Sequence, residues 1–210
     1  MTALEFLSVS AASDGAVAKS SMERAQREAG ARFEERDGWL VPVTILGEEE
    51  HLGSVGIADL SHLTKIELRT LYRTPDATHN MVVASNSPEF VTYRISNRRT
   101  LVLGSRAEAE QFRAPLDGPL VLDVTGALGI LAVVGPEAET VIRRLTHLHH
   151  FPSGGEVAHI TAHVLKPQEQ TYWIVFPQEY GHYLWEVAVD RATPLGGGPV
   201  GVDAIRGARA

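Results

Sequence analysis

The stretch VLDVTGALGILAVVGPEAETVIRRL, residues 121–145, decides the fold. An apolar run from Leu128 to Val134 has the length of a buried strand, and Gly135-Pro136 interrupts it. From Ala138 apolar residues return at helical spacing, with acidic residues in the first turn and two arginines facing outward. The stretch predicts a strand, a sharp turn with Pro136 at the first helical position, and a helix packed on that strand.

The composition bounds what the rest of the chain can be. Its 210 residues are 44% hydrophobic, which is enough for a core in one large domain or two small ones. A net charge of −7 argues against binding to nucleic acid. The sequence contains neither a membrane-length apolar run nor a leader-like start, so we expect no membrane partner and a cytoplasmic location. The absence of cysteine excludes disulfides, thiolate metal sites and thiol nucleophiles.

Before the central stretch, turn-forming residues and apolar runs predict a series of short elements. Residues 22–30 predict an exposed helix capped by Ser21 and ended by Gly30. Asp37-Gly38 predicts a tight turn between a strand from Ala31 and a strand from Trp39 to Ile45. The other elements expected here are an acidic connection over 47–53, strands over 64–69, from 91 and from 100, a turn over 96–99, and a helix over 106–113; residues 70–90 cannot be ordered.

After the central stretch, we expect a loop over 151–155 and strands over 156–165 and 171–176. A helix over 178–189 would place Tyr180, Tyr183, Leu184 and Val187 on one face, and a flexible glycine-rich link from residue 196 would lead into a last helical turn. Strands and helices that do not alternate regularly indicate an α+β fold with a largely antiparallel sheet.

Two short segments suggest an internal repeat. Asp59-Leu-Ser and Asp123-Val-Thr both place an aliphatic residue and a hydroxyl after an aspartate, and an isoleucine follows seven residues after each aspartate. We therefore expect two β-rich halves packed about a pseudo-twofold. The predicted organisation is an N-terminal arm over 1–21, a first half over 22–118 and a second half over 119–210.

Several residues invite a catalytic or metal-binding interpretation. The histidines at positions 147, 149, 150, 159 and 163 are interpreted as a surface cluster near a helix end, and no metal is expected. Asp59 and Asp123 are interpreted as turn residues in preference to catalytic carboxylates. Ser61 and His62 would point to opposite faces of a strand, so a serine hydrolase is not expected.

Glycine-rich and aromatic residues lead to no ligand site. Gly196-Gly197-Gly198 lacks the lysine and hydroxyl of a phosphate-binding loop, so nucleotide binding is not expected there. The aromatic residues are interpreted as core or interface anchors in preference to a ligand cage; they are Trp39, Tyr172, Trp173 and Trp185.

Taken in order, a set of short segments resembles the glycine-cleavage T-protein (aminomethyltransferase) family. The segments are REAGARF (27–33), Gly38-Trp39, Pro42, VGIADLSH (55–62), DVT (123–125), GPEA (135–138), PQEY (177–180) and PVGVDAIR (199–206). The resemblance implies a folate-binding α+β fold with two related β-rich domains. The chain stops near the point where that family's C-terminal β domain would begin, so we expect this domain to be lacking.

Departures from the family pattern bear on function. The family carries an Asn followed by Gly-Gly and paired aspartates at its folate and catalytic site, and nothing between Leu71 and Leu103 reproduces them. Its Gly-Glu step would fall on Gln168-Glu169, which leaves Glu169 as the candidate cofactor-binding residue. The Lys-Gly-Cys motif of the related iron–sulfur maturation proteins is impossible without cysteine. No catalytic residue is assigned.

A short member with these departures looks most like the gamma subunit of heterotetrameric sarcosine oxidase. The resemblance implies a non-catalytic subunit of a flavin- and folate-dependent amine-demethylating complex, with a larger flavoprotein as partner and tetrahydrofolate as a possible ligand. The partner would cover aromatic faces around Trp173 and Trp185. Two alternatives stay open: a stand-alone folate-dependent one-carbon transferase whose acid is Glu169 or Asp59, and a small-molecule-binding or regulatory module.

Overall fold

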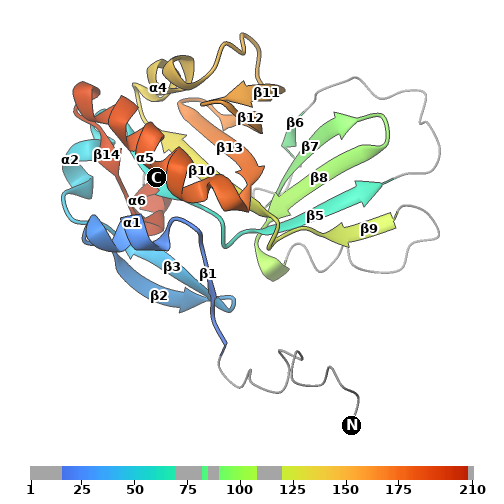
Figure 1. Ribbon diagram of the computed structural model, residues 1–210, viewed down its shortest axis with the longest axis horizontal. Helices are drawn as coiled ribbons and strands as arrows, with labels where there is room; N and C mark the ends of the chain where they lie inside the picture. Colours follow the sequence, from blue (N-terminus) through green and yellow to red (C-terminus); the bar gives the residue numbers. More distant parts are fainter. Residues whose placement is uncertain (1–15, 70–81, 85–89, 108–119, 208–210) are drawn as a thin grey trace.

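The computed structural model describes residues 16–69, 82–84, 90–107 and 120–207. These residues form three β-sheets and a few short helices (Figure 1). Most strand pairs are antiparallel; β1 with β3 and β14 with β4 are parallel pairs. The expected α+β class is confirmed. Within these ranges, no helix is both long enough and apolar enough to cross a membrane.

The elements have the following bounds. The hairpin sheet has the order β1-β3-β2 and comprises β1 (Ala18–Lys19), β2 (Arg32–Arg36) and β3 (Trp39–Thr44). The six-stranded sheet has the order β11-β12-β13-β10-β4-β14 and comprises β4 (Gly56–Asp59), β10 (Leu128–Val134), β11 (Ser153–Val157), β12 (Ile160–Gln168), β13 (Thr171–Pro177) and β14 (Gly198–Pro199). The five-stranded sheet has the order β6-β7-β8-β5-β9 and comprises β5 (Thr64–Arg69), β6 (Val82–Ala84), β7 (Phe90–Ser96), β8 (Arg99–Gly104) and β9 (Leu120–Asp123). The helices are α1 (Glu23–Glu28), α2 (Glu48–Leu52), α4 (Ala138–Leu145), α5 (Gly181–Ala192) and α6 (Val202–Gly207), with 3-10 turns η3 (Gln178–Tyr180) and η4 (Thr193–Leu195).

The two larger sheets are built on one plan. In one sheet β6, β7 and β8 lie in order beside β5, and in the other β11, β12 and β13 lie in order beside β10. The remaining strands are exchanged, because β4 pairs with β10 and β9 pairs with β5. The internal repeat predicted from the sequence is therefore present in the structure. Each repeat places its first strand in the sheet of the other repeat, so the division at residue 118 stays a prediction.

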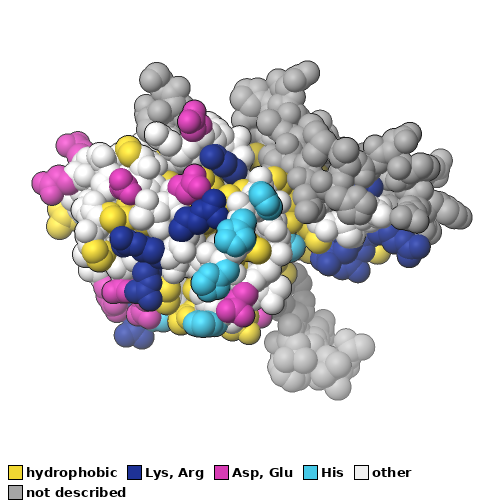
Figure 2. All heavy atoms as spheres, turned by 90° about the horizontal axis from the view of Figure 1, so that it is seen from above, with side chains coloured by type: hydrophobic (Ala, Val, Ile, Leu, Met, Phe, Trp, Pro, Cys, Tyr) yellow, Lys and Arg dark blue, Asp and Glu magenta, His cyan; other side chains and the backbone are white. Residues whose placement is uncertain are grey.

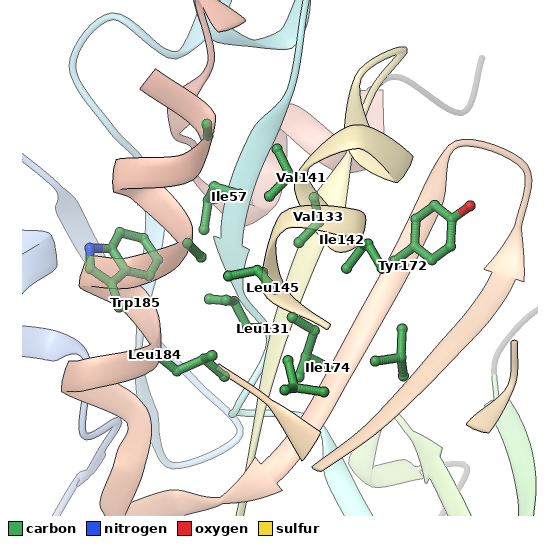
Figure 3. Close-up of a cluster of buried hydrophobic side chains, with 14 of the residues drawn as sticks. Ile57, Leu131, Val133, Val141, Ile142, Leu145, Tyr172, Ile174, Leu184 and Trp185 are labelled. Carbon is green, nitrogen blue, oxygen red and sulfur yellow. The ribbon is translucent and has the colours of Figure 1, made fainter. Parts of the chain in front are cut away.

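The central stretch folds as strand, turn and helix. Strand β10 lies between β13 and β4, and the four apolar positions of α4 are buried while Arg143 and Arg144 are exposed. Figure 3 shows side chains of α4, α5, β4, β10 and β13 converging on one apolar cluster. The expected place of Pro136 is wrong: Glu137 is the N-cap and the helix begins at Ala138, so Pro136 lies in the turn before the cap.

Two predicted features of the first half are confirmed and two differ. Asp37 and Gly38 have φ values of 53° and 78°, as a tight hairpin turn between β2 and β3 requires. Gly30 has φ +80° just after α1. Ser21 does not cap that helix: Met22 is the N-cap, and the Ser21 hydroxyl donates to the Gln178 carbonyl at 2.6 Å. The acidic connection over 47–53 contains the short helix α2.

The expected loop over 151–155 and single strand over 156–165 are wrong. β11 and β12 form a hairpin whose turn residues, Ala158 and His159, have φ values of 47° and 64°. Neither residue is one of the usual turn formers, so the sequence carried no signal for the turn. The expected helix over 106–113 lies largely outside the described residues.

The last predicted helix buries only part of the expected face: Leu184 is buried and Val187 packs against the same apolar cluster, whereas the two tyrosines do not. Gly181, Leu184, Trp185, Ala188 and Ala192 are its buried residues. The two tyrosines of the expected face are instead 44% and 40% exposed. The 3-10 turn η3 precedes α5, so the helix starts at Gly181 and not at residue 178.

The glycine-rich segment after α5 is closely packed and is not a flexible link. Gly198 pairs with Gly56 in strand β14. A Cβ atom at Gly197 would lie 2.4 Å from the Val55 carbonyl oxygen, and one at Gly201 would lie 2.2 Å from the Val43 carbonyl oxygen. Glycine is needed at these positions because the backbone passes directly over its neighbours.

Candidate functional site

The two aspartates of the repeat start the turns that join the exchanged strands. Asp59 Oδ1 accepts a hydrogen bond from the Ser61 N–H at 2.8 Å, and Asp123 Oδ1 accepts one from the Thr125 N–H at 2.9 Å. Asp59 Oδ2 also accepts a bond from Gln26 Nε2 at 2.8 Å. With 2% of its surface exposed, Asp59 has both oxygens engaged by protein groups. The interpretation of both aspartates as turn residues is confirmed.

The hydroxyls of the two turns connect the repeats to each other. Ser61 Oγ accepts a hydrogen bond from the Ile130 N–H at 3.2 Å, and Thr125 Oγ1 accepts one from the Lys65 N–H at 3.0 Å. Each hydroxyl therefore satisfies a backbone donor of the other repeat. We call the two turns, together with Lys65, the turn junction.

Lys65 is a completely buried lysine in the turn junction. Its amine donates to the Ser61 carbonyl at 2.6 Å and to the Thr125 carbonyl at 3.1 Å, and it lies 5.6 Å from the centre of the Trp39 ring. Burial lowers the pKa of Lys65 to about 7, against a smaller opposing effect of the charges of Asp59 and Asp123. A neutral amine has two N–H donors, which match the two carbonyl acceptors.

Sequence reasoning missed Lys65 as a site residue. In strand β5 polar and apolar residues alternate, and this pattern predicts that the side chains of Lys65 and Glu67 face solvent. Both are buried: Lys65 lies against the two turns that contain Ser61 and Thr125, and Glu67 is covered by Arg69 and Arg99. Only the strand order reveals this burial.

A small cavity lies near the turn junction. It has a volume of about 290 Å³ and is lined by Arg36, Asp37, His62, Leu63 and Ser105. The guanidinium group of Arg36 is already paired, because it donates two hydrogen bonds of 2.7 and 2.8 Å to the Asp203 carboxylate. Pockets for drug-sized ligands span roughly 300–1,000 Å³. The volume of this cavity lies at the lower end of that range.

The other predicted site residue and the histidines lie elsewhere. Glu169 is exposed in the turn between β12 and β13, and it does not line the cavity. Its expected role in cofactor binding stays a prediction. Figure 2 shows histidine side chains on one face of the molecule, and His147, His149 and His150 are exposed after α4. No group of three metal-binding side chains occurs in the part of the chain that the structure describes.

One histidine is separated from the surface cluster. His163 is half-buried, and its Nδ1 lies 3.2 Å from the Tyr93 hydroxyl. This contact joins β12 of one repeat to β7 of the other. Burial, assisted by Arg99, lowers the pKa of His163. His163 therefore belongs to the interface between the sheets.

The comparisons with known proteins agree with this architecture. No protein-family model matches the chain. Aminomethyltransferases of Corynebacterium jeikeium and Chlorobium luteolum are 21% and 22% identical, over 88% and 89% of this chain. The chain covers 61% and 62% of these two proteins, so it spans about three fifths of the curated relatives that it matches.

Two solved structures have a similar fold. Glycine cleavage system aminomethyltransferase T from Bartonella henselae matches with a TM-score of 0.65 and 17% identity, covering 90% of this chain and 60% of that one. A chain of heterotetrameric sarcosine oxidase from Corynebacterium sp. U-96 matches with a TM-score of 0.57 and 15% identity, covering 71% of this chain and 91% of that one. The resemblance to the glycine-cleavage T-protein family is thereby confirmed, and this chain has the T-protein fold.

Proposed function

We propose that this chain is a non-catalytic, T-protein-like subunit of a flavin- and folate-dependent amine-demethylating complex. The proposal rests on the burial and the hydrogen bonds of Asp59. This carboxylate is buried, and its two oxygens accept hydrogen bonds from Ser61 and Gln26. A catalytic acid or base must reach the proton that it transfers. Asp59 acts within the fold instead.

Two further facts support a subunit role. The sarcosine oxidase chain that this fold resembles comes from a heterotetramer and is covered over 91% of its length. The cavity lined by Arg36 and His62 is small, with a volume of about 290 Å³. We therefore assign flavin chemistry and most of the folate site to other chains, with a larger flavoprotein as the partner.

Purification from the native source tests the subunit role. The tagged full-length chain should co-elute with a larger, flavin-containing protein in fixed proportion, and the pair should oxidise an N-methyl amine. Elution of the chain without a flavoprotein, at every salt concentration tried, would contradict the proposal.

The curated relatives favour a second candidate, a tetrahydrofolate-dependent aminomethyltransferase, because both are named aminomethyltransferases. In that case Glu169 is the proposed cofactor-binding carboxylate. Titration with tetrahydrofolate separates the two functions. Tight binding by the chain alone, lost in Glu169→Gln and kept in Glu179→Gln, would favour the transferase. Glu179 is a matched control because it is also an exposed glutamate in a turn.

A further inference from the structure

The partner surface expected around Trp173 and Trp185 is wrong. These side chains are only 8% and 3% exposed, and both belong to apolar clusters within the chain. Their rings already pack against strands and helices of the same chain, so a second protein cannot cover them. A partner must bind elsewhere.

Arginines gather at one end of the five-stranded sheet. Arg69 ends β5, while Arg94, Arg98 and Arg99 belong to the β7–β8 hairpin. Segments 67–69 and 94–100 contain these four arginines and one acidic residue, Glu67, although the whole chain has a net charge of −7. Figure 2 shows Lys and Arg side chains on the right, the side on which Figure 1 draws this sheet. Arg94 pairs with Thr100, which neighbours Arg99 in β8, so Arg94 lies on the other face of the sheet from Arg69 and Arg99. We call Arg69, Arg98 and Arg99 the arginine corner.

Glu67 fixes two of these side chains in place. Arg99 donates to its carboxylate through Nε at 3.0 Å and Nη2 at 2.8 Å, and Arg69 donates through Nε. The hydrogen bonds from Arg99 and Arg69 hold the pKa of Glu67 below its usual range, although burial acts in the opposite direction. The carboxylate is 5% exposed, whereas the arginine side chains are 45% and 49% exposed.

An apolar side chain lies in the same row of the sheet. Arg69 pairs with Arg99 on one side and with Leu120 on the other, so these side chains project from one face. Leu120 is 56% exposed and begins β9, the edge strand. Arginines beside an exposed apolar residue match the composition of protein interfaces, where Arg is enriched.

We propose that the arginine corner and Leu120 bind an acidic segment on the surface of the larger subunit. This inference rests on the proposed function and adds the surface and the chemistry of the contact. Prearranged guanidinium groups bind carboxylates with little further loss of side-chain freedom. An acidic partner segment is attracted here and repelled by the remainder of this negatively charged chain, so charge selects the docking site.

Charge reversal tests the corner. Arg98→Glu alters an exposed turn residue outside the Glu67 ion pairs, and Arg24→Glu, on exposed helix α1, makes the same change elsewhere. The probes are a fluorescein-labelled oligo-glutamate peptide and the co-purified flavoprotein. At low salt Arg98→Glu should weaken binding of both by about five- to tenfold, as two charge units at contact distance imply, and high salt should reduce the difference. Arg24→Glu should bind like the unmodified chain.

Two results would overturn the proposal. One is equal binding by Arg98→Glu and Arg24→Glu. The other is displacement of the peptide by inorganic pyrophosphate at much lower concentration than by free oligo-glutamate, which would indicate a site for phosphate groups. If no flavoprotein co-purifies, the proposed function fails, and the peptide measurement still decides whether the corner binds acidic segments.

Discussion

Replacement of Lys65 by methionine should remove a large pH dependence of stability. In the folded chain burial lowers the pKa of Lys65 to about 7, from its usual value of 10.5. Between these pH values the unfolded chain holds a proton that the folded chain has lost, so the free energy of unfolding rises with pH. Below pH 7 both states are protonated and the penalty for the buried charge is complete. Above the pKa of Lys65 in the unfolded chain, this penalty has disappeared.

The size of the effect follows from the pKa difference. Each pKa unit corresponds to about 1.4 kcal/mol, so the unmodified chain should gain about 2 kcal/mol of unfolding free energy from pH 7 to pH 9. The Lys65→Met chain should lack this gain. Its stability at any one pH is less informative, because methionine also leaves the carbonyls of Ser61 and Thr125 without the amine donor.

Urea denaturation at a series of pH values measures this difference directly. Lys166→Met is the matched control, because Lys166 is exposed on β12 and the same substitution there should leave the pH dependence intact. Parallel pH curves for the unmodified chain and Lys65→Met would refute the reasoning, since the buried amine would then be protonated equally in both states.

Two other substitutions test the packing around the turn junction. Asp59→Asn should lower the free energy of unfolding by about 1–3 kcal/mol in urea titrations, because an amide has one oxygen and cannot accept the hydrogen bonds from both Ser61 and Gln26 in the same way. Loss of activity at unchanged stability would instead indicate a catalytic role for Asp59. Gly201→Ala should lower the thermal midpoint, at a cost of about 1–3 kcal/mol, because the added Cβ atom would meet the Val43 carbonyl oxygen. Gly126→Ala is the control, because a Cβ atom there meets no atom within 4 Å and the midpoint should not change. Similar midpoints for the two variants would refute this.

The sequence predicted the elements whose signals are local. The apolar run from Leu128, the helical spacing after Ala138 and the Asp37-Gly38 turn all identify their structures without knowledge of neighbours. The turn at Ala158 was missed because its positive φ values are imposed by the hairpin and are not favoured by its residue types. In α5 the apolar pattern identified only part of the buried face, because Tyr183, which was expected on that face, is exposed.

The candidate site was less predictable than the fold. The two aspartate turns were visible as a repeated pattern, and their structural role was predicted correctly. Their meeting at Lys65 depends on which strands pair, and this pairing joins residues about sixty positions apart, such as Lys65 and Thr125. The ion pairs of Glu67 likewise depend on the pairing of β5 with β8.

The exchange of β4 and β9 bears on how the protein loses its structure. If the first repeat opens, β10 loses its neighbour β4 and becomes an edge; if the second opens, β5 loses β9 in the same way. Unfolding of one repeat thus exposes a row of unpaired backbone groups in the other. The two repeats should therefore unfold in a single cooperative transition. A fragment that contains only one repeat would expose an unpaired edge strand and should tend to self-associate.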